Sequence, residues 1–62
     1  MTPKEQQARR RELHALPTTK LINLYAAKSG HLVGEVRDMV RGLNDEGRGI
    51  LIDGIVNREK GR

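Results

Sequence analysis

The chain has 62 residues and a formal net charge of +4, with no cysteine, Phe or Trp and a single Tyr. A chain of this length forms one domain at most, and its core usually supplies only about 3–5 kcal/mol unless a disulfide, a metal or a second chain adds stability. The lack of cysteine excludes disulfides and thiolate metal sites, and the longest apolar run, residues 24–27, is too short for a signal peptide or a membrane span.

The first segment, residues 1–16, is predicted to be a basic helix. Thr2 can cap this helix and Glu5 can complete a capping box, while Pro17 ends it. Its first two turns carry almost no apolar side chains, so we expect them to fray. We therefore expect a basic N-terminal arm followed by a helical packing module over residues 17–62.

Three consecutive arginines, Arg9–Arg11, are the sharpest charge feature of the chain. In a helix they fan across about 200°, so they suit contacts on either side of a phosphate backbone rather than one flat face. Nucleic-acid binding is one interpretation, because each phosphate contact releases counterions. A solvated helix end, partly neutralised by Glu5 and Glu12, is the simpler interpretation and the one that we favour. The candidate phosphate-binding residues are Arg9, Arg10, Arg11, Lys20, Lys28, Arg37 and Arg41.

Two amphipathic helices are predicted next. Thr18 or Thr19 can cap a helix that runs to about Ser29, and Gly30 suits a left-handed exit from it. The following helix has the clearest periodicity in the chain. Its apolar stripe is formed by Leu32, Val36, Met39 and Leu43, widened by Val33 and Val40.

The stretch from Tyr25 to Met39 partly resembles a helix-turn-helix, because small and apolar residues stand at suitable distances from Gly30. Ser29 and His31 depart from that pattern, since apolar residues usually lock such a turn. Leu32 and Val33 also depart from it, because they stand where polar groups should meet base edges. An ordinary helical hairpin is the alternative, and we favour it.

The last helix is predicted from about residue 46 to 60, after a turn that begins at Asn44. Ile50 projects away from the main apolar face, so this helix needs a second covering surface. A buried strand over residues 49–52 is the competing interpretation, but no second strand is evident to pair with it. The main apolar face consists of Leu51, Ile52, Ile55 and Val56.

We therefore expect an all-α bundle of three to four short helices. The expected core is Leu21, Leu24, Tyr25, Val36, Met39, Val40, Leu43, Leu51, Ile55 and Val56. Leu32, Val33, Ile50 and Ile52 are surplus apolar residues, which we assign to an interface with a protein partner or a second copy of the chain.

These patterns predict a non-catalytic, cytoplasmic interaction protein, an adaptor or regulatory subunit, with DNA or RNA binding as the alternative. No catalytic, cofactor, metal or small-molecule site is expected, because His14 and His31 lack the spacing of paired ligands and the chain leaves little room for an enclosed pocket. Attachment to an anionic membrane is less favoured, since the first helix has too few apolar residues to insert.

Overall fold

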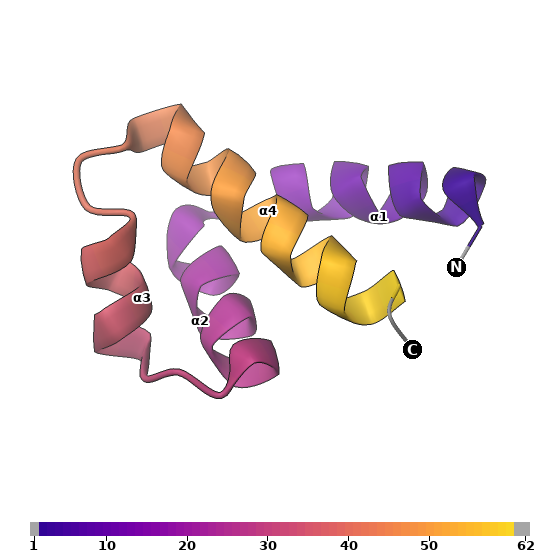
Figure 1. Ribbon diagram of the computed structural model, residues 1–62. Helices are drawn as coiled ribbons and strands as arrows, with labels where there is room; N and C mark the ends of the chain where they lie inside the picture. The colour runs from indigo at the N-terminus through magenta and orange to yellow at the C-terminus, as the bar shows by residue number, and fades with distance from the viewer. Residues whose placement is uncertain (1, 61–62) are drawn as a thin grey trace.

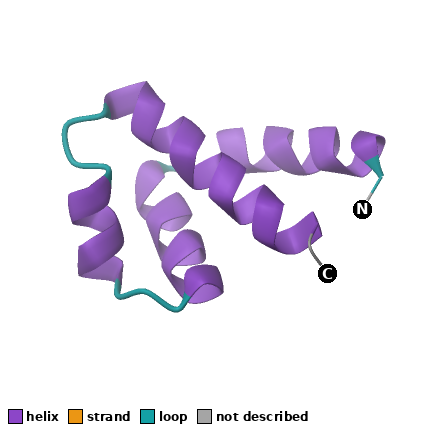
Figure 2. Cartoon of the chain, in the orientation of Figure 1, coloured by secondary structure: helices purple, strands orange, loops and turns teal. Residues whose placement is uncertain are grey.

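Four helices make up the computed structural model, which describes residues 2–60 (Figures 1 and 2). They are α1 (Pro3–His14), α2 (Thr18–Ser29), α3 (Val33–Met39) and α4 (Asn44–Lys60). The all-α prediction is confirmed. Residues 49–52 lie inside α4, so the competing strand interpretation is wrong.

The last helix, α4, holds the bundle together. It packs against both α2 and α1, while α3 packs against α2. In Figure 1, α4 crosses in front of the end of α1, and α3 lies beyond α2 on the side away from α1. Two helices of the same chain, α1 and α2, therefore cover α4, although Ile50 stays 45% exposed.

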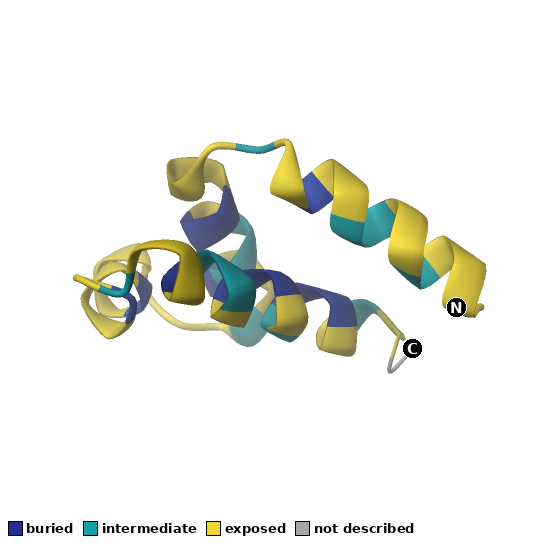
Figure 3. Ribbon diagram, turned by 90° about the horizontal axis from the view of Figure 1, so that it is seen from above, coloured by how far each residue is buried: buried dark blue, intermediate teal, exposed yellow. Residues whose placement is uncertain are grey.

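The core lies between these helices (Figure 3). Its buried members are Leu13, Leu21, Ile22, Ala26, Val36, Val40, Leu51, Ile52, Ile55 and Val56. Leu24 and Tyr25 are partly buried and pack against this cluster, and Leu43 is also partly buried. Six of the ten predicted core residues are thus buried. Also buried are Leu13, Ile22 and Ala26, which are not among the predicted core residues.

Two predicted positions are corrected by the structure. Ile52 is predicted to be surplus at the surface but is only 1% exposed, because α4 is covered by two helices and buries a wider face than one neighbour would cover. Met39 is predicted to be in the core but is 46% exposed. It stands at the end of α3, which packs mainly against α2 and so leaves one flank uncovered.

The predicted helix ends are mostly reproduced. Thr2 and Glu5 form the capping box of α1, and Gly30 leaves α2 in the left-handed region at φ 78°. The cap of α2 is Pro17, with no side-chain hydrogen bond, so the predicted threonine cap is wrong. The third helix stops at Met39, and Gly42 turns the chain with a φ of 80°.

Candidate interaction surface

A shallow groove lies between the end of α2 and the length of α3. It has a volume of about 190 Å³ and is lined by Tyr25, His31, Glu35, Val36 and Met39. The floor is apolar, because Val36 is buried and Tyr25 packs against the core. The rim carries an exposed pair in which His31 Nδ1 lies 3.4 Å from a carboxylate oxygen of Glu35.

Leu32 extends the apolar surface beside this groove. Its side chain is 71% exposed, the highest value among the exposed large apolar residues of the described chain. Leu32 is the N-cap residue of α3 and directly follows His31, which lines the groove. The groove and Leu32 are together called here the α2–α3 surface.

Two other predicted interface residues lie elsewhere. Val33 is 38% exposed but stands about 100° around α3 from Leu32. Ile50 is 45% exposed and belongs to α4, which begins at the opposite end of α3 from Leu32 (Figure 1). With Ile52 buried, the four predicted interface residues do not form one patch.

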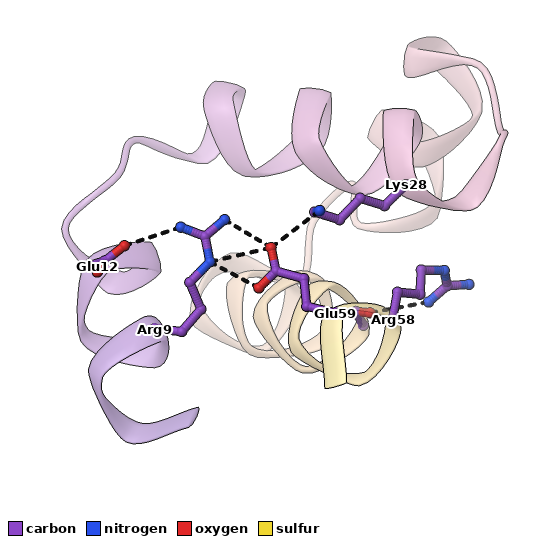
Figure 4. A network of polar contacts seen from close by, with 6 residues as sticks. Arg9, Glu12, Lys28, Arg58 and Glu59 are labelled. Atoms are coloured by element: carbon purple, nitrogen blue, oxygen red, sulfur yellow. Dashed lines mark hydrogen bonds and ion pairs between the residues drawn. The ribbon is translucent and has the colours of Figure 1, made fainter. Parts of the chain in front are cut away.

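Three of the five candidate phosphate-binding cations on α1 and α2 form ion pairs with α4. Arg9 Nη2 donates to Glu59 Oε2 at 2.9 Å and Arg9 Nη1 to Glu12 Oε2 at 3.1 Å, while Lys28 Nζ lies 3.1 Å from Glu59 Oε2 (Figure 4). Arg10 forms a further ion pair with Asp53 of α4. Carboxylates of α4 thus bind cations that α1 and α2 present to it.

The same network shifts the ionisation of its central members. The hydrogen bonds from Arg9 lower the pKa of Glu59, and Lys28 acts in the same direction, against a smaller effect of burial. The bond to Glu59 raises the pKa of Arg9. Both shifts stabilise the charged forms, so the network persists at neutral pH.

The other candidate cations have a different environment. Arg11, Lys20, Arg37 and Arg41 are exposed, and none of them forms an ion pair within residues 2–60. Sequence alone treats Arg9, Arg10 and Arg11 as equivalent. Only the position of α4 separates the two that are paired from the one that is free.

Arg48 has a structural position that the sequence does not indicate. Its guanidinium donates to the carbonyl oxygens of His14 at 2.9 Å and Leu16 at 2.8 Å, and to the Thr18 hydroxyl at 3.0 Å. These bonds fix the turn between α1 and α2 against α4. The Gly-Arg-Gly sequence around Arg48 lies within helix α4.

The bundle also has two other surface hollows. One, of about 360 Å³, lies where the α3–α4 connection meets the start of α2 and includes Asn44 and Asp45 in its lining. The other, of about 320 Å³, lies beside Leu16 and Leu24. Across residues 2–60, no three His, Asp or Glu side chains stand close enough together to hold a metal ion.

The helix-turn-helix interpretation stays a prediction. The α2–α3 pair has the left-handed Gly30 and the buried Val36 that the motif requires. However, α3 has only seven residues, and Leu32 and Val33 are exposed at its beginning.

Comparison with known protein families, with curated proteins and with solved structures gives no match for this chain. Within the described residues, no helix has both the length and the apolar character needed to cross a membrane.

Proposed function

We propose that this protein is a non-catalytic interaction protein, an adaptor or regulatory subunit, that binds a protein partner through the α2–α3 surface. The observation that carries this proposal is the exposure of Leu32, whose side chain is 71% accessible beside an apolar groove. An exposed apolar surface next to a groove is typical of sites that bind another protein.

The surroundings of the groove support this proposal. Met39 is a flexible side chain that adapts to different partner shapes. Tyr25 offers an aromatic wall, and Arg58 stacks over its ring at 4.9 Å from the centroid, which holds that wall in place. A second copy of the chain is the other class of partner that the sequence predicts.

Photo-cross-linking from position 32 tests the proposal. A photoreactive amino acid replacing Leu32 should give a specific protein adduct in cells that naturally express the chain, and Met39→Ser should abolish that adduct. The control position is Asn57, which is exposed on α4 away from the groove. Adducts of equal yield from positions 32 and 57 would show that the contact is not specific.

Light scattering separates the two classes of partner. A mass twice that of the monomer, reduced to one chain by Leu32→Ser, would identify a second copy as the partner. A stable monomer that binds no hydrophobic dye and gives no adduct would contradict the proposed function.

A further inference from the structure

The basic charge of the chain is concentrated in its first two helices. α1 has four basic and two acidic residues, and α2 has two basic residues and no acidic one. In α3 and α4 acidic residues outnumber basic ones. The difference in net charge between the two halves of the sequence is therefore a difference between α1 and α2 on the one hand and α3 and α4 on the other.

The ion pairs with α4 divide these cations into an inner and an outer set. Arg9, Arg10 and Lys28 point toward α4 and are neutralised by its carboxylates. Lys4, Arg11 and Lys20 are exposed, and none of them has an ion-pair partner among the described residues. These last three residues are called here the outer cations.

Two of the outer cations share one face of α1. Lys4 and Arg11 are seven residues apart, so they lie on the same side of the helix about 10 Å from each other along its axis. The two carboxylates of α1 lie about 100° around the helix from them. Glu5 is engaged by Thr2 in the capping box and Glu12 by Arg9.

Lys20 lies just beyond the turn that joins α1 to α2. Arg48 holds that turn rigidly through the bonds to His14, Leu16 and Thr18. Figure 3 shows α1 and this turn along one edge of the molecule, with α4 on the other side. The outer cations are thus the cations of α1 and α2 that no carboxylate of α4 neutralises.

We propose that this outer face of α1 and the start of α2 binds the phosphate backbone of a nucleic acid. Unpaired Lys and Arg side chains on rigid helices bind phosphates without reading sequence, and their binding is driven by counterion release. An anionic membrane fits this face less well, because the exposed apolar residues beside these cations are Ala8 of α1 and Ala15 at its C-cap, and both are too small to insert. This second site is independent of the α2–α3 surface.

Fluorescence anisotropy with a labelled DNA duplex of about 20 base pairs, at about 50–200 mM salt, tests the proposal. Three phosphate contacts predict that log K falls with log salt with a slope of roughly −2.7. The double variant Arg11→Ala/Lys20→Ala should weaken binding at the lowest salt by at least about tenfold and bring the slope to roughly −0.9.

The matched control is Arg37→Ala/Arg41→Ala, which removes the same charge from exposed residues at α3 and the connection after it. It should leave affinity within about twofold of the original chain, and circular dichroism should show both variants folded. Equal losses in the two double variants, or no salt-dependent binding by the original chain, would overturn the proposal. Binding to vesicles of anionic lipid without binding to DNA or RNA would also overturn it.

Discussion

Glu59 joins three helices through one side chain. It stands on α4 and accepts hydrogen bonds from Arg9 of α1, while its carboxylate also pairs with Lys28 of α2. Its side chain is only 14% exposed, so water screens these pairs less than it would at the open surface. The carboxylate of Glu59 therefore connects α4 to both α1 and α2, which a surface ion pair rarely does.

Replacing Glu59 by Gln should lower the free energy of unfolding by roughly 1–3 kcal/mol, because Lys28 loses its partner and Arg9 keeps only Glu12. Urea denaturation at neutral pH measures this. The control is Glu12→Gln, the same change at an exposed carboxylate that pairs with Arg9, which should cost less than about 0.5 kcal/mol. Equal costs for the two variants would contradict the central position of Glu59.

The lowered pKa of Glu59 also predicts how stability depends on pH. A carboxyl whose pKa is lower in the folded state stabilises the fold above its unfolded pKa, near 4.5, and this contribution is lost as the pH falls through the folded pKa. The original chain should therefore lose more stability between neutral pH and acid than Glu59→Gln does. Equal losses of stability in the original chain and in Glu59→Gln would contradict the assignment of this pH dependence to Glu59.

Gly54 of α4 lies directly against the ring of Tyr25 on α2. A Cβ atom at this position would overlap the ring of Tyr25, so Gly54→Ala should destabilise the protein by about 1–3 kcal/mol. Gly49→Ala is the control, because a Cβ there meets no atom within 4 Å and Ala favours a helix by about 1 kcal/mol. Thermal unfolding should shift in opposite directions for the two variants, and a shift in the same direction would refute the prediction.

At the scale of the element, α1 is attached to the bundle through its middle and its end. Toward its end, Leu13 is fully buried in the core and Arg48 fixes the turn that follows. In its middle, Arg9 and Arg10 pair with Glu59 and Asp53. The expected fraying of its first two turns stays a prediction, because it concerns motion rather than position.

Leu13→Ala should lower the free energy of unfolding by roughly 2–4 kcal/mol, since it leaves a cavity between α1 and the rest of the core. Leu32→Ala is the matched control, because it removes the same atoms from an exposed side chain and should cost less than about 0.5 kcal/mol. Chemical denaturation compares them. Similar values for the two would mean that α1 does not share the core.

At the scale of the molecule, the helices share one core, and α4 connects the first half of the chain with the second. Removing residues 1–16 would delete Leu13 and Leu16 and uncover the side of α4 that α1 covers. We expect the remaining chain to lose its sharp unfolding transition, because small domains have little stability to spare. Calorimetry of residues 17–62 tests this, and a retained sharp transition would show instead that those residues form a module by themselves.

Much of the fold follows from local signals in the sequence. The capping box of Thr2 and Glu5, the exit at Gly30 and the apolar periodicity all act within a few residues, so they predict the number of helices and their approximate ends. The sequence predicts the α2–α3 surface less completely. Leu32 is correctly predicted to be exposed, but the groove that begins at its neighbour His31 depends on how α3 lies against α2.

The sequence by itself determined that this chain is helical and basic in its first half, since these properties depend on composition and short-range spacing. Only the tertiary structure decided that Ile52 is buried, that Met39 is exposed, and that Arg9 and Arg10 are paired while Arg11 is free. The physical reason is that burial and ion pairing depend on which helices meet. In this protein, that depends on α4 crossing both α1 and α2.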